Sequence, residues 1–325
     1  MMNDTKKKWQ RPSKGQVLRW VGTLISSALF IWLLLQQDWA KTFESLSTAP
    51  LWLLPLVFAL YVSGMMINSL RWNFLLRAQN VNIPVLETLK LVITGAFASN
   101  FLPSTIGGDT LRAVGLLRYN VSLTLSAASV VVDRLMNVMA MLTFIPFSFA
   151  VFGNQLDLFL SGSQSLNIGV PSILLFGMVS VTKEWTERWI NKLKNWFMRA
   201  WDIVKVWLHR PGVLVGAFVL SWLSSFVIFF GIWILARGLG MEIALYEVMG
   251  IMVLTYFISM LPISINGYGL REVAVTALYM QVGASLEQAS TLAVITRFML
   301  LLETLPGALW LSDIVTPEKK GKEST

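Results

Sequence analysis

The sequence predicts an all-α polytopic membrane protein with about six crossings and two re-entrant, broken helices that are arranged as an inverted repeat. Hydrophobic residues make up 55% of the chain and charged residues only 14%, a balance that ordinary soluble domains do not show. Several apolar runs reach the roughly 20 residues that a helix needs to cross a bilayer. A Pro/Gly-rich break that occurs twice predicts the repeat.

The two breaks match residue by residue. Residues 103–112 read Pro-Ser-Thr-Ile-Gly-Gly-Asp-Thr-Leu-Arg, and residues 262–271 read Pro-Ile-Ser-Ile-Asn-Gly-Tyr-Gly-Leu-Arg. We name them the first corner and the second corner. In the flanks, the interval from Arg77 to Glu87 equals that from Arg237 to Glu247. Because self-similarity at a fixed separation indicates repeated structure, we expect two related halves, at about 51–153 and 213–312.

The chain begins with a basic segment, residues 1–16, which we expect in the cytoplasm. The apolar run Val17–Gln36 follows, and no small-residue cleavage pattern comes after it, so it predicts an uncleaved first span. A second span, Leu51–Leu70, ends at Arg71 and Arg77. Since Lys and Arg are concentrated in cytoplasmic connections, this end returns to the inside.

The next elements contain the first corner. Residues 87–103 are apolar but interrupted by polar side chains, which favours a half-helix that turns back at the proline. A short helix, Thr110–Arg118, then leads to a long span, Leu123–Phe152. After a polar connection on the outside, residues 168–181 predict another, shorter span.

Residues 183–208 predict an amphipathic helix. Its apolar stripe carries five tryptophans, and its opposite face is basic. Tryptophan favours the headgroup layer, so we expect this helix to lie on the cytoplasmic surface of the membrane. A soluble helix that packs on another domain is the alternative. The tryptophans are Trp185, Trp189, Trp196, Trp201 and Trp207.

The second half repeats the first. Residues 213–236 cross outward, residues 248–262 form the second half-helix, residues 290–311 cross back, and a charged tail occupies 313–325. Both termini then lie in the cytoplasm, whereas Arg77 and Arg237 lie at opposite faces. Inverted repeats with broken helices near the bilayer middle are typical of secondary transporters, whose substrates bind at the breaks.

We therefore place a substrate site at the two corners. A new helix begins after each one, with Asp109 suited to cap the first, and free backbone N–H groups at such a start can bind a phosphate together with an arginine. Alternatively, the arginines are interfacial anchors or structural ion pairs. The candidate residues are Pro103, Gly107, Gly108, Asp109, Arg112, Pro262, Asn266, Gly267, Gly269, Arg271 and Glu272.

Four charged residues lie inside predicted spans: Asp133, Arg134, Arg297 and Glu303. Charges at this depth are costly and are usually paired or functional. Asp133 and Arg134 are adjacent on one helix, so they point in different directions, and we expect them to pair with Arg297 and Glu303 across the bundle. Such pairs could stabilise the bundle alone, or Asp133 or Glu303 could carry a proton that couples transport.

The composition excludes several classes of function. Cysteine is absent and His209 is the single histidine, so we expect neither a metal or redox cofactor nor catalytic residues. The net charge of +8 indicates membrane topology and contact with anionic lipids more than nucleic-acid binding.

Three ordered motifs resemble the lysylphosphatidylglycerol synthase transmembrane domain family, also called flippase-like domain proteins: residues 100–113, Asp133-Arg134, and residues 262–272. The resemblance implies a lipid-translocating protein of a bacterial or archaeal cytoplasmic membrane. Full synthases of this family add a soluble aminoacyl-transferase domain. The chain ends at Thr325, so we do not expect that activity.

Two functions fit these observations. In the first, the protein is a flippase that moves an anionic phospholipid or a polyprenyl-phosphate-type lipid between leaflets. In the second, it is the membrane subunit or scaffold of a separate lipid-modifying enzyme, which docks through the amphipathic helix. The expected partners are membrane lipids in the first case and that enzyme in the second.

Overall fold

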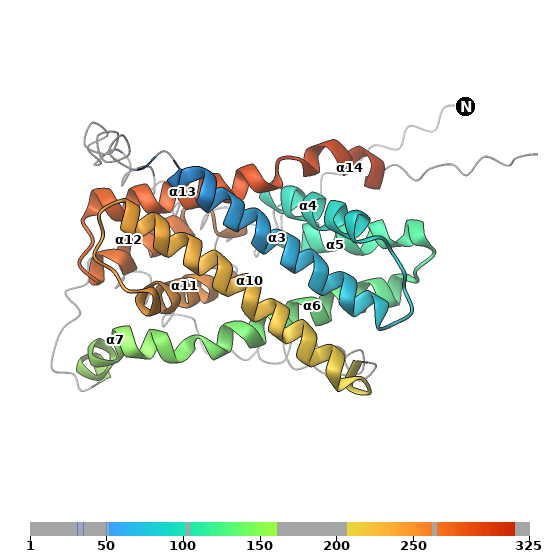
Figure 1. Ribbon diagram of the computed structural model, residues 1–325, viewed down its shortest axis with the longest axis horizontal. Coiled ribbons are helices and arrows are strands. Elements are labelled where there is room, and N and C mark those ends of the chain that lie inside the picture. The colour runs from blue at the N-terminus through green and yellow to red at the C-terminus, as the bar shows by residue number, and fades with distance from the viewer. Residues whose placement is uncertain are drawn as a thin grey trace, which may run out of the picture.

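The computed structural model describes residues 52–101, 105–160, 207–261 and 265–315, together with isolated earlier positions. Every regular element in these ranges is helical (Figure 1). The predicted spans 17–36 and 168–181, most of the amphipathic helix 183–208, the two corner prolines Pro103 and Pro262, and the terminal segments lie outside the described residues.

The helices follow one another in two runs of the same order, each with a long helix, a medium one, a short one, a long one and a final one. The first run is α3 (Leu53–Arg77), α4 (Val85–Phe101), α5 (Thr105–Gly115), α6 (Leu123–Thr143) and α7 (Ile145–Leu160). The second is α10 (Pro211–Gly238), α11 (Leu245–Met260), α12 (Leu270–Gln281), α13 (Leu286–Thr304) and α14 (Gly307–Val315). Short 3₁₀ helices are η1 (Leu116–Tyr119) and η2 (Ile265–Gly267).

The turns repeat as well. A residue with positive φ follows the first helix of each run, Asn80 in one and Gly240 in the other. The fourth helix of each run begins after a serine N-cap, Ser122 or Ser285, whose hydroxyl accepts a backbone hydrogen bond. Serine at this position satisfies one of the free N–H groups of the helix start. The sequence repeat therefore corresponds to a repeat of local structure.

Helices α3 and α10 form an antiparallel pair through the middle of the molecule (Figure 1). Gly238, at the end of α10, faces Leu53 at the start of α3, and Gly216, near the start of α10, faces Phe74 near the end of α3. Midway, the Ser224 hydroxyl donates to the carbonyl of Gly64 at 3.1 Å. Small residues allow such close approach between membrane helices. The corresponding helices of the two runs thus point in opposite directions.

The final helix of each run packs on the other run. Helix α7 lies against α11, where the Ser148 hydroxyl donates to the Gly250 carbonyl at 2.8 Å. Helix α14 lies against α4 in the same way, with Gly307 next to the backbone of Ile93. Figure 1 shows α7 beside α11 and α14 beside α4. The last helix of each run thus covers the second helix of the other run: α7 covers α11, and α14 covers α4.

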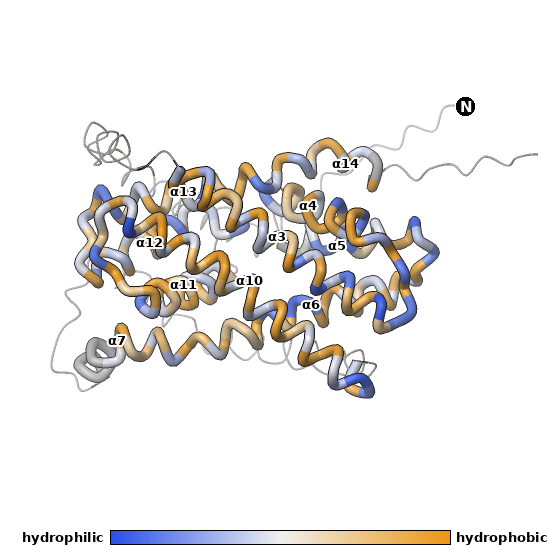
Figure 2. The backbone as a smooth tube through the Cα atoms, in the orientation of Figure 1, coloured by the Kyte–Doolittle hydropathy of each residue, from blue (hydrophilic) through white to orange (hydrophobic). Residues whose placement is uncertain are grey.

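Within the part of the chain that the structure describes, three helical segments are long and apolar enough to cross a membrane: Leu53–Arg77, Leu123–Gly153, which contains α6 and the start of α7, and Pro211–Gly238. They correspond to the predicted spans that begin at 51, 123 and 213. In Figure 2, α3 and α10 are mainly hydrophobic, whereas hydrophilic turns gather at the two ends of the molecule. The total number of crossings remains a prediction.

Two of the predicted spans differ in the structure, and a proline lies at each difference. The span 123–152 is two helices, because α6 ends at Thr143 and α7 begins at Ile145, directly before Pro146. The span 290–311 is also divided, since α13 ends at Thr304 before Pro306 and α14 follows. Proline removes a backbone donor and interrupts helical hydrogen bonding.

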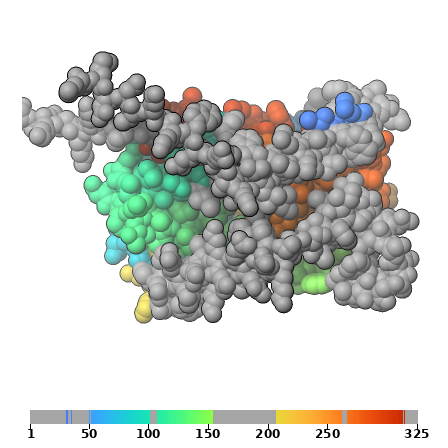
Figure 3. Space-filling model, turned by 180° about the vertical axis from the view of Figure 1, so that it is seen from behind, coloured from blue at the N-terminus to red at the C-terminus, as the bar shows by residue number. Residues whose placement is uncertain are grey.

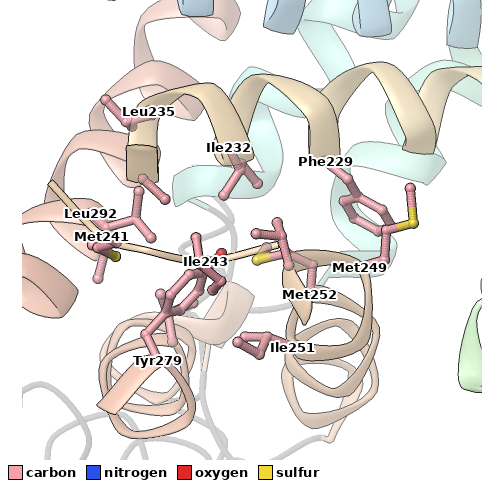
Figure 4. Close-up of a cluster of buried hydrophobic side chains, with 14 of the residues drawn as sticks. Phe229, Ile232, Leu235, Met241, Ile243, Met249, Ile251, Met252, Tyr279 and Leu292 are labelled. Atoms are coloured by element: carbon pink, nitrogen blue, oxygen red, sulfur yellow. The ribbon is translucent and has the colours of Figure 1, made fainter. Parts of the chain in front are cut away.

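The largest core cluster contains buried side chains from α3 and α6 of the first run and from α10, α11, α12 and α13 of the second. Figure 4 shows side chains from α10, α11, α12 and α13 that meet around Ile243, Ile251 and Tyr279. A second cluster surrounds Trp72 and Leu116 in the first half. Seen from behind, the first-half helices around α5 lie at one end and second-half helices at the other (Figure 3).

Because α3 and α10 are antiparallel, we expect their C-terminal ends to lie on opposite sides of the membrane. Arg77 and Arg237 are exposed, and they are the last residue of α3 and the second-last residue of α10. We expect Arg77→Cys and Arg237→Cys to react with a membrane-impermeant maleimide from opposite sides of intact vesicles, against a natural background free of cysteine. Asn80→Cys and Gly240→Cys are the matched controls, and each should follow its neighbour. Labelling of both helix ends from the same side would contradict the inverted arrangement.

Candidate functional site

The first corner continues into a helix that starts earlier than predicted. Helix α5 begins at Thr105, so Gly107, Gly108 and Asp109 lie inside it and Asp109 does not cap it. A Cβ atom on Gly108 would lie 2.0 Å from Ser99 Oγ and 2.1 Å from the Gly95 carbonyl oxygen of α4. Gly108 is therefore required by the contact between α4 and α5, whereas the prediction assigned it to the approach of a ligand.

Charged side chains from α3, α5 and α6 form one connected group, which we name the first charge cluster: Arg71, Asp109, Arg112, Asp133 and Arg134. Asp133 is only 2% exposed. Its carboxylate accepts hydrogen bonds from Arg71 Nε at 2.7 Å and from Arg112 Nη2 at 2.9 Å. Arg134 donates to both oxygens of Asp109 at 3.0 Å, in the bidentate geometry that arginine favours.

Polar and aromatic side chains complete this cluster. The guanidinium of Arg112 lies 4.2 Å from the ring centre of Trp72, a cation–π distance. Arg71 Nη1 donates to the Ser221 hydroxyl of α10 at 2.9 Å, which joins the cluster to the second half. Arg71 also contacts Asn137 at 3.4 Å, and Asn137 donates to the Tyr256 hydroxyl of α11 at 3.2 Å.

The second corner keeps the backbone geometry that its glycines predict. Asn266, Gly267 and Gly269 have φ values of 49°, 71° and 75°, a region that glycine and asparagine adopt most readily. Asn266 Nδ2 donates to Asn100 Oδ1 at 3.0 Å, and Asn100 donates to the Thr304 hydroxyl at 3.1 Å. The second corner is thus hydrogen-bonded to the end of α4, next to the first corner.

A second charge cluster follows this corner, and we define it as Tyr268, Arg271, Glu272 and Arg297. Glu272 is 1% exposed, and its Oε1 accepts a hydrogen bond from Arg297 Nε. Its other oxygen accepts the backbone N–H of Gly269 at 2.8 Å. Arg271 Nη1 lies 3.9 Å from the same carboxylate. Glu272 therefore occupies the start of α12, where the sequence predicted that a ligand phosphate binds.

The predicted ion pairs across the bundle are wrong. Asp133 and Arg134 pair with partners in their own half, and Arg297 pairs with Glu272 in the other half. Arg134 and Arg297 each contact a carboxylate on the short helix of their own run. Glu303 makes no ion pair with the residues that the structure describes.

Sequence reasoning missed Arg71, which we had assigned to the end of a span and to topology. The structure buries Arg71 at 4% exposure within α3, six positions before the helix ends. That position was the available signal, because an arginine more than one turn inside an apolar helix needs a counter-ion. The aspartate that supplies it is 62 residues away in sequence, so spacing alone could not identify the pair.

Several buried polar atoms have no hydrogen-bond partner among the described residues. Three belong to arginines, namely Arg112 Nε, Arg271 Nη1 and Arg297 Nη2. Two others are the hydroxyls of Tyr61 and Tyr279. An unsatisfied buried donor costs about 1 to 3 kcal/mol, so these atoms are candidate positions for a bound ligand or water molecule. No group of three or more metal-ligating side chains occurs within the described ranges.

Substitution of Gly108 tests the helix contact at the first corner. We expect Gly108→Ala to lower stability by at least about 1 to 3 kcal/mol, because the added methyl group overlaps the backbone of α4. The matched control is Gly153→Ala on α7, where nothing lies within 4 Å of the added atom. Thermal unfolding in detergent measures both. Equal stability of the two variants would contradict a packing role for Gly108.

The second substitution tests the buried carboxylate of the first charge cluster. We expect Asp133→Asn to lower the free energy of unfolding by roughly 3 to 5 kcal/mol, since it leaves the buried Arg71 without a carboxylate partner and Arg112 with only Asp109, 3.6 Å away. Glu87→Gln is the control, because its pair with Lys90 is about one-third exposed on each side and worth at most about 1 kcal/mol. A stable Asp133→Asn variant would show that the arginines have another counter-ion.

Comparison with known proteins agrees with the membrane architecture. The family model described as lysylphosphatidylglycerol synthase TM region matches residues 19–307, which include both corners and both charge clusters. The UPF0104 membrane protein PH1989 of Pyrococcus horikoshii is 24% identical over 112 residues, which are 34% of this chain and 33% of that protein. The chain thus aligns with about a third of this relative's length. No solved structure matches. Because the family model covers most of its length, the chain belongs to the lysylphosphatidylglycerol synthase TM region family.

Proposed function

We propose that the protein is a flippase that moves an anionic lipid, of the phospholipid or polyprenyl-phosphate type, between the leaflets of the cytoplasmic membrane. The observation that carries this proposal is the excess of buried positive charge at the second corner. In the first charge cluster, the buried arginines Arg71 and Arg112 face two aspartates, and Arg134 is half exposed. The second charge cluster holds two arginines against one glutamate. Buried charge is expensive unless it is paired. An anionic headgroup would supply the missing charge.

The arrangement of the halves supports a transport mechanism. Corresponding helices α3 and α10 pack antiparallel, as they would in an inverted repeat. The corners of the two halves meet through Asn266 and Asn100. In transporters of this design, substrate binds where the repeats meet and one repeat moves against the other. We therefore place the headgroup between the two corners. Movement of one half against the other would expose this site to each side of the membrane in turn.

Coupling to a proton gradient is part of the proposal. The chain contains no nucleotide-binding sequence of the Walker A type, so an ion gradient or consumption of lipid on one side would drive net movement. Asp133 already serves two arginines as their counter-ion. That leaves Glu303, on α13 next to the hydrogen-bonded Thr304, as the residue that would bind and release the coupled proton.

The scaffold function is the second candidate, and one observation favours it. Trp207, the last tryptophan of the predicted amphipathic stripe, is fully buried and donates its indole N–H to the Leu75 carbonyl at 3.2 Å. The end of that segment is therefore anchored on α3, which would hold a docking helix in place. Neutralising Lys192, Lys194 and Arg199 together should then remove a lipid-modifying enzyme from affinity purifications.

Reconstitution into liposomes tests the flippase directly. We expect purified protein to exchange a labelled anionic lipid between leaflets faster than protein-free liposomes, and Arg271→Gln to reduce this rate at least tenfold. The probes are labelled phosphatidylglycerol, phosphatidic acid and polyprenyl phosphate, with phosphatidylcholine as the zwitterionic control, and the readout is accessibility to an impermeant quencher. Equal exchange of all probes, or none with and without a proton gradient, would contradict the proposal and favour the scaffold.

A further inference from the structure

We propose that the second corner binds a phosphate oxyanion between Nη1 of Arg271 and Nη2 of Arg297, in the position that corresponds to the Asp109 carboxylate of the first half. The inference rests on the proposed function for the identity of the ligand as a lipid headgroup, but the binding site itself can be tested without transport. Helix α12 supplies Arg271 and helix α13 supplies Arg297, and these two helices pack on each other.

The repeat identifies which residues of the two halves correspond. Arg112 and Arg271 are each the tenth residue of their corner. A further arginine recurs twelve positions after the serine that caps the fourth helix of each run. The seventh residue of the corner differs, because it is Asp109 in the first half and Tyr268 in the second. The second half therefore keeps both arginines but lacks this carboxylate.

In the first half, one carboxylate oxygen lies between the corresponding arginines, Arg112 and Arg134. Asp109 Oδ1 accepts a hydrogen bond from Arg134 Nη2 at 3.0 Å and lies 3.6 Å from Arg112 Nη1. The other oxygen of Asp109 accepts a hydrogen bond from Arg134 Nε at 3.0 Å. An internal anion thus occupies the space between the two guanidinium groups.

In the second half, the corresponding arginine atoms have no hydrogen-bond partner among the described residues. Arg271 Nη1 and Arg297 Nη2 are both buried and unpartnered. Glu272 replaces Asp109 only in part, because its Oε1 accepts from Arg297 Nε but lies 3.9 Å from Arg271 Nη1. Since both arginines approach this one oxygen, their guanidinium groups lie close together. An oxyanion between them would supply the missing acceptor by charge-assisted hydrogen bonds.

Tyr268 covers the face of the Arg297 guanidinium and leaves its edge available. The guanidinium carbon lies 4.4 Å from the centre of the Tyr268 ring, a cation–π distance. The N–H groups of a guanidinium lie in its plane, so contact with a ring on its face does not use them. The tyrosine therefore holds the guanidinium in place without supplying the negative charge that Asp109 supplies in the first half.

The charge balance of the second charge cluster favours a ligand with one negative charge. Arg271 and Arg297 carry two positive charges against the single negative charge of Glu272, and both arginine side chains are 12% exposed. Buried charge that is not neutralised is costly. A phosphodiester carries one negative charge, so the headgroup of a glycerophospholipid would neutralise the cluster.

Glu303 enters this balance through its protonation. It lies six positions after Arg297 on α13, which is about 240° around the helix, so it faces away from that arginine. Glu303 and Arg271 both act electrostatically on Tyr61, and an ionised Glu303 would therefore offset part of the positive excess. With the proton that the proposed function assigns to it, Glu303 adds no charge, and the excess of one positive charge remains.

Replacement of Tyr268 by aspartate or by asparagine tests the site with a matched pair. Tyr268→Asp restores the carboxylate of the first half, so we expect it to occupy the two unpartnered N–H groups and to lower the affinity for the probe lipid at least about tenfold. Tyr268→Asn has nearly the same shape without the charge and should keep most of the wild-type affinity. The aspartate variant should also unfold at a higher temperature than the asparagine variant, because it neutralises buried arginines.

The probes are dihexanoyl phosphatidylglycerol and inorganic phosphate, titrated by calorimetry into the purified full chain in detergent. Binding of phosphatidylglycerol alone would assign the site to a lipid headgroup, and binding of both would assign it to the phosphate group itself. Binding of inorganic phosphate alone would overturn the assignment to a lipid. The site is overturned if the wild type binds neither probe, or if the aspartate and asparagine variants bind phosphatidylglycerol equally tightly.

A second variant removes one of the two arginines and keeps the Arg297–Glu272 pair. We expect Arg271→Gln to lower the affinity for phosphatidylglycerol at least about tenfold, because it removes a hydrogen bond between charged groups. Arg237→Gln removes an exposed arginine of the same half and should leave the affinity unchanged. An equal loss in both variants would show that the probe binds through overall charge, and would overturn the site.

Transport assays separate this inference from the proposed function. Wild-type protein that exchanges labelled lipid in liposomes but binds neither probe would overturn the site and leave the flippase standing. Protein whose binding of phosphatidylglycerol is blocked by Tyr268→Asp, but which exchanges no lipid, would support the site and overturn the flippase.

Discussion

The neutralisation of Asp133 is the interaction on which the packing of the first half depends. A carboxylate that is 2% exposed inside an apolar bundle would cost many kcal/mol without compensation. Arg71 of α3 donates to one of its oxygens and Arg112 of α5 donates to the other. Helices α3, α5 and α6 can therefore pack closely only in the one arrangement that brings these three side chains together. The Ser221 contact of Arg71 extends this constraint to α10.

The two halves share their order of helices but have diverged in their polar interiors. In the first half, the arginine of the corner has two carboxylates within reach, and a tryptophan covers its face. In the second half, the glutamate that follows the corner arginine turns back to the helix start and binds another arginine. Symmetry of fold therefore does not imply symmetry of function. The half with fewer internal partners is the better candidate for ligand binding.

The glycines of the two corners are required for different physical reasons. Gly108 is needed because α4 and α5 approach so closely that a methyl group would overlap a backbone carbonyl. Gly267 and Gly269 have positive φ, which other residues adopt only with strain. One corner is thus a site of close helix packing and the other is a true backbone turn. Their similar sequences arise from two different steric requirements, both of which glycine satisfies.

The sequence by itself determined the all-helical membrane class of the protein and the positions of most helices. These features depend on local properties: hydropathy, which the bilayer imposes over about 20 residues, and proline and glycine, which interrupt helices. Helices α3, α4, α10 and α11 accordingly begin and end within a few residues of the prediction, apart from α3, which continues to Arg77.

Only the tertiary structure decided which charges meet. The pairs Arg71–Asp133 and Arg297–Glu272 join helices whose contact depends on the packing of the entire bundle. The tertiary structure also decided that α5 starts at Thr105. Asp109 therefore lies inside the helix beside Arg134 and is not the N-cap residue. The packing likewise leaves the hydroxyls of Tyr61 and Tyr279 without a partner among the described residues. Hydrogen bonding between distant residues depends on three-dimensional distance, and neither composition nor spacing encodes that distance.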